Sequence, residues 1–260
     1  MSKPHDELTA CLKELGLPTA RACYAEVVDS ARREELTHEA YLLEVLAREC
    51  QGRRQNRIGR RLRESRLPVD KSLCAFDLKR LPAKVSAVVR TLVDGSFVDR
   101  KENVLAFGNP GSGKTHLLCG IGQELVRGGR TVYFASTNLL VQDLLLAKRE
   151  LKLPKAIQKL SRYQALILDD LGYVQQSREE MEVLFTLLAE RYERGSVLIT
   201  SNLPFSKWES IFKDAMTTAA AIDRLVHHSV ILELNLPSYR VEQAKKSKAA
   251  GHIDVPPPQA

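Results

Sequence analysis

The sequence predicts an α/β fold built on a parallel sheet and preceded by a small all-helical module. From about residue 76 onward, short apolar runs alternate with longer amphipathic stretches, which is the pattern of strands joined by crossover helices. In the first 50 residues the apolar side chains recur at helical spacing instead. The 260 residues suffice for both parts, so we expect a helical module over 1–70, an α/β domain over 71–250 and a disordered tail over 251–260.

The helical module divides into an acidic part and a basic part. Residues 1–50 hold ten acidic and six basic side chains, and the stretch at 16–19 interrupts their helical pattern. Residues 53–66 include seven arginines and a single acid. Several of these arginines fall on one helical face, which predicts a basic helix. We expect Leu67-Pro68 to end it, because proline disfavours helix in the residue before it.

Strands and helices alternate through the predicted α/β domain. The apolar runs predict strands over 103–107, 131–135, 165–168, 196–200 and 229–233. The stretches between them predict helices over 116–126, 139–147 and 179–194. Strands that alternate with helices in this way pair in parallel, and ligands bind beyond the carboxyl ends of such strands.

A glycine-rich loop joins the first predicted strand to its helix. Residues 108–115 match the phosphate-binding pattern G-x-x-x-x-G-K-[ST] at every fixed position, and the strand–loop–helix order disfavours an accidental glycine turn. The glycines let backbone N–H groups point inward, and the helix N-terminus adds partial positive charge. The lysine can reach the β- and γ-phosphates, while the threonine hydroxyl can bind Mg²⁺. We expect a nucleoside triphosphate to contact Gly108, Asn109, Pro110, Gly111, Ser112, Gly113, Lys114, Thr115 and His116.

Two adjacent carboxylates follow the third predicted strand. Asp169 and Asp170 come directly after four apolar residues, which places them at the edge of the sheet where ligands bind. Asp169 can hold Mg²⁺ through water beside Thr115, and Asp170 is the candidate for polarising the attacking water. The alternative is an acidic turn after a core strand, which the phosphate loop upstream disfavours.

Two further polar residues are candidates for the same reaction. Asn202 follows the fourth predicted strand, where its amide can orient the attacking water; the alternative is an asparagine that begins the turn into Leu203-Pro204. Arg224 lies on a short helix before the last strand, where it can stabilise charge in a neighbouring subunit's site. The alternative for Arg224 is a salt bridge with Asp223 or Glu233.

Two basic clusters are candidates for binding a phosphate backbone. One is the arginine-rich helix and the other follows the helix predicted at 139–147, with its basic residues able to share one helical face. A solvated face is the alternative for both. Apart from Tyr163 the clusters lack aromatic residues that stack single-stranded bases, which favours duplex DNA. The candidate DNA contacts are Arg53, Arg54, Arg57, Arg60, Arg61, Arg63, Lys148, Arg149, Lys152, Lys155 and Lys159.

The net charge, the cysteines and the absence of long apolar runs limit the kind of partner and compartment that we expect. The net charge of +7 is compatible with a polyanionic partner. Five cysteines form no C-x-x-C pair, which indicates a reducing cytoplasm rather than a disulfide framework or a zinc site. We find neither a signal-peptide pattern nor a run long enough to span a bilayer, so we expect no membrane contact. His227-His228 lacks acids or cysteines at ligand spacing and Trp208 stands alone, so we expect both to be structural.

Five stretches of the second half form a specific string of motifs. They are residues 165–173, 184–194, 200–205, 222–229 and 238–240. This string resembles the IstB family, the ATP-binding helpers encoded beside the transposase in certain insertion sequences, and the resemblance covers nearly the whole chain. The family is similar to the DnaC helicase loaders and, more distantly, to the DnaA initiators, all of which are AAA+ ATPases.

The resemblance implies a fold and a set of residue roles. The fold would be the AAA+ P-loop NTPase, a three-layer sandwich around a parallel sheet. By position, Lys114 and Thr115 would belong to the Walker A motif, and Asp169 and Asp170 to the Walker B motif. Asn202 would be the sensor 1 residue, and Arg224 would be the arginine finger. Many AAA+ ATPases have glutamate at the position of Asp170, so hydrolysis would be slow or the geometry adjusted. Arg240 lies where a sensor 2 residue could sit, although no helical lid follows it.

The resemblance also implies a function. The protein would be an ATPase that assembles with ATP and Mg²⁺ on duplex DNA, bends it and presents it to the cognate transposase, which stimulates hydrolysis and disassembly. Its partners would be duplex DNA, the transposase and further copies of itself. The alternative is a DnaC-like replicative helicase loader, whose N-terminal module would grip a helicase and whose inner surface would prefer single strands. A small-molecule kinase is a third possibility, which the lack of evident lid arginines disfavours.

Overall fold

The structure of the chain is a computed structural model. It describes residues 3–172, 177–208, 215–239 and 241–242. The chain divides into two compact units, Met1–Arg60 and Arg61–Ala260. The predicted tail over 251–260 lies outside the described residues. None of the described helices combines the length and the apolar character that crossing a bilayer requires.

The division at Arg60 falls earlier than the predicted boundary at residue 70. The segment between them packs on the second unit, because Leu67 is buried in that unit's core. The carbonyl of Ser65 also accepts a hydrogen bond from the Phe134 N–H at 2.8 Å.

Helices make up the described part of the N-terminal unit. They are α1 (Lys3–Glu14), α2 (Pro18–Arg33) and the first part of α3 (His38–Glu64). Pro18 is at the start of α2, where the missing N–H of proline is not needed. The core of this unit is small, and its buried side chains are Ala20, Tyr24, Val27 and Val45.

One buried charge joins α2 to α3. The Glu49 side chain accepts hydrogen bonds from the N–H groups of Thr19 and Ala20 at 2.8 and 2.9 Å, and from Arg53 Nε at 2.8 Å. Burial alone would raise the pKa of Glu49, but these hydrogen bonds outweigh it and hold that pKa below its ordinary value near 4.5. The carboxylate therefore also meets the positive end of the α2 dipole in its charged form.

The predicted basic helix is the second half of α3. This helix continues without interruption from the acidic part into the arginine-rich part and ends at Glu64, close to the predicted end. Arg66 then takes a positive φ of 57°, which turns the chain before Leu67-Pro68. The long helix thus carries both charge signs in succession.

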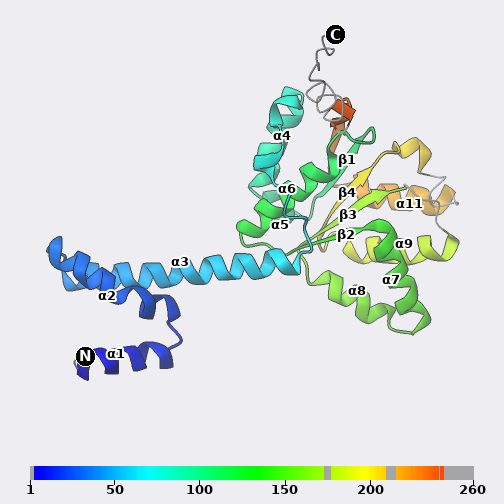
Figure 1. Cartoon of the computed structure of the whole chain (residues 1–260). Helices are drawn as coiled ribbons and strands as arrows, with labels where there is room; N and C mark the ends of the chain where they lie inside the picture. The colour runs from blue at the N-terminus through cyan, green and yellow to red at the C-terminus, as the bar shows by residue number, and fades with distance from the viewer. Residues whose placement is uncertain (1–2, 173–176, 209–214, 240, 243–260) are drawn as a thin grey trace, which may run out of the picture. The chain divides into compact units, whose positions relative to one another are not determined.

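A five-stranded parallel sheet forms the centre of the second unit, in the order β2-β3-β4-β1-β5 (Figure 1). Every strand lies where the sequence predicted it, to within a few residues. This order puts β4 between the strand that carries the two carboxylates and the strand that leads into the phosphate loop. The strands are β1 (Asn103–Gly108), β2 (Val132–Ser136), β3 (Ala165–Leu171), β4 (Ser196–Ser201) and β5 (Ser229–Leu234).

Alternate strand residues bury against two layers of helices on opposite faces of the sheet (Figure 1). Leu166 and Ile199 share a hydrophobic cluster with α7 (Thr137–Arg149), α8 (Leu153–Ser161), α9 (Arg178–Arg191) and α11 (Ala215–Val226). Ile167 and Leu198 share the other cluster with α4 (Ala83–Val93), α5 (Ser96–Asp99) and α6 (Lys114–Arg127). The predicted three-layer α/β sandwich is confirmed.

The prediction that the second basic cluster shares one helical face is wrong. Helix α7 ends at Arg149, Leu151 takes a positive φ of 57°, and α8 begins at Leu153. Lys148 and Lys155 therefore lie on different helices. The predictions from sequence did not include α4 and α5, nor the short 3₁₀ turns η1 (Leu73–Ala75), η2 (Leu78–Arg80) and η3 (Phe205–Lys207).

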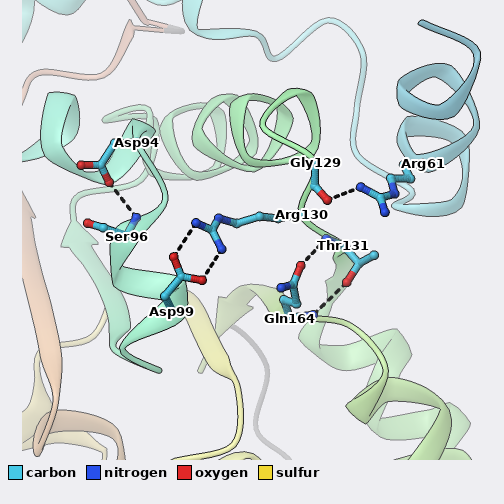
Figure 2. Close-up of polar contacts among 8 residues, drawn as sticks. All are labelled: Arg61, Asp94, Ser96, Asp99, Gly129, Arg130, Thr131 and Gln164. Carbon is cyan, nitrogen blue, oxygen red and sulfur yellow. Dashed lines mark hydrogen bonds and ion pairs between the residues drawn. The ribbon is translucent and has the colours of Figure 1, made fainter. Parts of the chain in front are cut away.

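Polar contacts fasten the amino edge of the sheet to the helices beside it (Figure 2). Arg130, between α6 and β2, donates two hydrogen bonds to the Asp99 carboxylate of α5 at 2.5 and 2.7 Å. Where the chain enters β2 and β3, the Thr131 N–H donates to Gln164 Oε1 at 3.0 Å and the Gln164 N–H donates to Thr131 Oγ1 at 3.1 Å. These contacts fix the end of the sheet opposite to the phosphate loop.

Candidate functional site

The phosphate-loop residues form a tight turn between β1 and α6. Gly111 and Gly113 have φ angles of 79° and 96°, which residues with a side chain rarely adopt. A Cβ atom at Gly111 would lie 2.2 Å from Ser238 Oγ, and one at Gly113 would lie 2.8 Å from the Phe76 ring. Both positions therefore require glycine, for conformation and for space.

The loop provides the groups that phosphate binding needs. The Lys114 ammonium donates to the carbonyls of Gly108 and Asn109 at 2.8 and 3.0 Å, which keeps the charge beside the loop. The buried Ser112 hydroxyl has no hydrogen-bond partner among the described residues. A cation, an unsatisfied hydroxyl and the N-terminus of α6 together fit the phosphates of a nucleotide.

A cavity of about 470 Å³ lies beside the loop, which is a typical volume for a small-molecule site. Asp170 and Asn202 line it together with the phosphate-loop residues, as the sequence predicted for their placement. The remaining lining residues were not predicted for this site, and they come from segments before β1 and after β5. Those residues are Lys71, Ala75, Phe76, Asp77, Arg80, Leu236 and Tyr239.

The chain after β5 is fastened across the phosphate loop. The Tyr239 N–H donates to the Gly111 carbonyl at 3.0 Å. The Arg80 guanidinium lies 5.0 Å from the centre of the Tyr239 ring and pairs with Glu242 at 2.8 Å. These aromatic and aliphatic surfaces, together with Phe76, provide an apolar wall suited to a nucleotide base. Arg240, considered for a sensor 2 role, lies outside the described residues.

The two carboxylates of β3 differ in environment. Asp169 is buried, and its Oδ1 accepts a hydrogen bond from Thr200 Oγ1 at 2.6 Å. Asp170 is exposed to the cavity and takes a positive φ of 58°. Asn202, which follows β4, lines the same cavity. Thr115 and Asp169 are hard oxygen donors of the kind that Mg²⁺ prefers; Thr115 lines the cavity, whereas Asp169 is buried and does not, and Asp170 is the accessible carboxylate.

Arg224 lies at the opposite end of the sheet from the phosphate loop. It lines a second cavity of about 230 Å³ with Asn103, the first residue of β1, and with His228, directly before β5. Gly108 is the last residue of β1, five residue steps from Asn103, which is about 16 Å at the usual rise of a strand. Within the described residues its guanidinium contacts the Ala220 carbonyl at 3.2 Å and the Phe185 ring at 5.1 Å.

The salt-bridge alternative for Arg224 finds no support in these contacts. Among the described residues neither Asp223 nor Glu233 lies within ion-pair distance of its guanidinium. The side chain is half-buried and faces a small cavity that is also lined by Arg100, Lys101 and one acid, Glu193. A partly accessible arginine can interact with an anion brought by another molecule.

The expectation that no acid accompanies the histidine pair is wrong. Glu193, in the segment between α9 and β4, brings its carboxylate within 4.8 Å of ring nitrogens of His227 and His228. Tyr192 Oη also lies 2.9 Å from His227 Nδ1. Sequence spacing gives no sign of this group, because its members meet only through the parallel pairing of the strands. Trp208, by contrast, is buried as expected, and its indole N–H donates to the Leu203 carbonyl.

The candidate DNA contacts fall into two groups. In one group the contacts within the chain are defined: Arg53 pairs with Glu49, Arg61 donates to the Gly129 carbonyl (Figure 2), Lys148 pairs with Glu182, and Lys152 pairs with Glu150. The members of the second group share an exposed side chain, and the role of both groups in DNA binding stays a prediction. The second group is Arg54, Arg57, Arg60, Arg63, Arg149, Lys155 and Lys159.

Comparison with known proteins adds to this geometry. A family model described as IstB-like ATP binding protein matches residues 10–248. An insertion-sequence ATP-binding protein of Sinorhizobium fredii is 42% identical over 238 residues, which cover 91% of this chain and 80% of that protein. An ATP-binding protein of insertion sequence IS21 from Pseudomonas aeruginosa is 37% identical over 241 residues, which cover 93% of this chain and 91% of that protein.

Solved structures agree on the fold. The crystal structure of the DnaC helicase loader matches with a TM-score of 0.56 and 20% identity, over 64% of this chain and 97% of that one. AMPPCP-bound DnaA from Aquifex aeolicus matches with a TM-score of 0.53 and 17% identity, over 74% of this chain and 58% of that one. The predicted AAA+ P-loop fold is thereby confirmed.

Proposed function

Because this chain belongs to the IstB-like ATP-binding family, we propose that it is an AAA+ ATPase that assembles head to tail on duplex DNA and regulates a partner transposase. The position of Arg224 carries the proposal of assembly. At the amino edge of the sheet this side chain lies too far from its own phosphate loop, so it would serve the site of another subunit. Such contacts between unlike faces are heterologous, and they close into a ring or continue as a helix.

Within one site each residue has a proposed task. The N–H groups of the loop and Lys114 bind the phosphates. Asp170 faces the cavity and accepts a proton from the attacking water, which Asn202 orients. Thr115 and Asp169 would hold Mg²⁺, which neutralises phosphate charge when it is bound. An arginine from the next subunit would stabilise charge in the transition state, an effect of about three to five orders of magnitude in related P-loop enzymes.

Two separate sets of residues are proposed to contact DNA, each considered by itself: the exposed arginines of α3, and the exposed basic residues of α7 and α8. Their contacts would be to phosphates and independent of base sequence. Bending duplex DNA costs on the order of 1–10 kcal/mol, which phosphate contacts from several subunits can offset. ATP binding would join the subunits, and hydrolysis would release them. The names of the relatives associate them with insertion sequences, which supports a transposase as the protein partner.

A replicative helicase loader is the second candidate, favoured by the likeness to DnaC in fold. In that function the N-terminal unit would grip a helicase and the assembly would prefer single strands. The family match and the more similar relatives favour the first function.

Measuring assembly tests the proposal. The full chain is mixed with duplex or single-stranded DNA, with and without ATP, and the mass of the complexes is determined by mass photometry, with Lys114→Ala as the control. We expect large complexes on duplex DNA that require ATP and are lost in the variant. Preference for single strands, or no assembly on DNA, would contradict the proposal and favour helicase loading. Stimulation of hydrolysis by a transposase of the same type of insertion sequence tests the partner separately.

A further inference from the structure

The strand that carries the two carboxylates is irregular where they occur. The pairing of β3 with β4 shifts register between Leu168 and Leu171. As a result, Asp169 and Asp170 together stand opposite a single residue of β4, Thr200. One extra residue on one strand is a β-bulge, a feature that re-aims side chains and is common beside active sites.

The Thr200 hydroxyl bonds to both residues of this bulge. It donates to Asp169 Oδ1 at 2.6 Å and accepts a hydrogen bond from the Asp170 N–H at 2.8 Å. Thr200 is 0% exposed, so water cannot replace either bond. Asp170 has a φ of 58°, in the left-handed region, which aspartate tolerates better than most residues with a side chain.

We propose that Thr200 is a positioning residue for ATP hydrolysis. Its hydroxyl fixes the Asp169 carboxylate for Mg²⁺ and holds the Asp170 backbone so that the Asp170 carboxylate faces the cavity. The inference rests on the proposed roles of these two aspartates. A donor that occupies one oxygen of a metal-binding carboxylate orients the group, as outer-shell hydrogen bonds do at metal sites in general.

Thr200→Val removes both bonds and keeps the shape of the side chain. Loss of an outer-shell partner typically weakens metal binding about 10- to 100-fold. We therefore expect the Mg²⁺ concentration for half-maximal hydrolysis to rise by about 10- to 100-fold. Nucleotide binding in the absence of Mg²⁺ depends on the phosphate loop and should be unchanged. Thr200→Ser, which retains the hydroxyl, should restore the original Mg²⁺ requirement.

Thr137 offers a matched control. It is also 0% exposed, and like Thr200 it donates a hydrogen bond to Asp169. The acceptor, however, is the backbone carbonyl of Asp169, at 2.8 Å from Thr137 Oγ1, and not the carboxylate. Thr137→Val therefore removes a buried hydrogen bond next to the site without touching the carboxylate. We expect this variant to lower the melting temperature while the Mg²⁺ requirement stays unchanged.

The experiment titrates Mg²⁺ against two readouts in the full chain: the hydrolysis rate and the affinity for a fluorescent ATP analogue. Melting temperatures monitor folding. If Thr200→Val keeps the original Mg²⁺ requirement in both readouts, or if Thr137→Val shifts it equally, the inference is overturned. Asp169→Ala separates the role of Thr200 from the role of Asp169. If nucleotide binding by this variant kept its Mg²⁺ dependence, the metal role of Asp169 itself would be refuted. If the valine variant does not fold, Thr200→Cys, a weak donor of similar size, should give an intermediate shift.

Discussion

At the scale of single residues, several buried polar side chains each satisfy more than one polar group. Thr200 does this at the bulge of β3, and Glu49 does it at the start of α2. Arg191 donates to the carbonyls of Tyr163, Gln164 and Ser196, and burial lowers its pKa to about 10, so it stays charged at neutral pH. Substituting such a residue leaves several groups without partners at once, which costs more than one lost bond.

Glu49 gives the first stability prediction. Its pKa is lowered in the folded state, so the stabilisation is fully present above the ordinary value near 4.5 and is lost as the pH falls through the folded value. Glu49→Gln should lower the free energy of unfolding by about 1–3 kcal/mol at neutral pH. The difference between the two proteins should shrink below about pH 4.5. Urea unfolding of both proteins, from neutral pH to below pH 4.5, measures this difference in the free energy of unfolding.

Glu44→Gln is the matched control for Glu49. Glu44 also pairs with an arginine four residues later, Arg48, at 2.7 Å, but both side chains are partly exposed. An exposed pair of this kind contributes little, so the control should change stability by less than about 0.5 kcal/mol. Equal effects of the two substitutions would show that the burial of Glu49 and its hydrogen bonds to α2 add nothing to the stability of the protein.

At the scale of elements, two helices of the second unit end in the same way with different residues. In α7 the Lys152 N–H donates to the Ala147 carbonyl and the Leu151 N–H to the Lys148 carbonyl. In α6 the equivalent bonds are donated by the N–H groups of Arg130 and Gly129. Both ends form the Schellman arrangement, which needs a positive φ at its turning residue. Helix α6 has glycine there, at 91°, whereas α7 has leucine at 57°.

Leu151→Gly should therefore stabilise the protein. The leucine side chain is 91% exposed, so the substitution gives up almost no buried surface and relieves an unfavourable backbone conformation. We expect a gain of about 1 kcal/mol, seen as a rise in melting temperature of about 2–4 °C. The reciprocal change, Gly129→Ala, has room for its Cβ and should lower the melting temperature by a similar amount. A decrease for Leu151→Gly would contradict this account.

Local pattern was enough to predict most elements but not their ends or irregularities. Each strand was predictable because a buried parallel strand is an uninterrupted apolar run between polar segments. The break between α7 and α8 was missed, although Pro154 in the first turn of α8 is a signal for a helix boundary. The turn itself is at Leu151, whose sequence identity gives no sign of its positive φ. Likewise the bulge at Asp169 depends on Thr200, which lies on another strand.

In the candidate site, features formed by consecutive residues could be predicted, whereas features formed by residues far apart in the sequence could not. The phosphate loop was predictable because eight consecutive residues carry its chemistry. The apolar wall of the cavity comes from Phe76 and Tyr239, which meet only when the chain after β5 crosses the loop. Glu193 joins the two histidines for the same reason. No spacing rule within one stretch of sequence reports contacts of this kind.

At the scale of the whole ATPase unit, the parallel sheet separates two functional ends. The phosphate loop, Asp170 and Asn202 follow carboxyl ends of strands and line one cavity. Arg224 and its basic neighbours lie at the amino ends and line the other. Arg224 cannot reach the phosphate loop of its own molecule, because a strand length of about 16 Å separates the two ends of the sheet. A single copy therefore presents half of the proposed active site at each end.

This polarity predicts complementation between two inactive variants. Asp170→Asn removes the proposed base but leaves the phosphate loop that ATP-dependent assembly requires, and Arg224→Ala removes the proposed charge contributed to the neighbour, so each variant alone should lose hydrolysis. In an equal mixture, about a quarter of head-to-tail interfaces should pair an intact Asp170 with an intact arginine from the neighbour, and hydrolysis should recover to a comparable fraction. The rate is measured as a function of the mixing ratio with duplex DNA present, and the isolated Arg224→Ala subunit should still bind ATP. A mixture that stays inactive would place Arg224 in its own subunit's site or in folding, because an arginine acting in cis cannot be supplied by a partner.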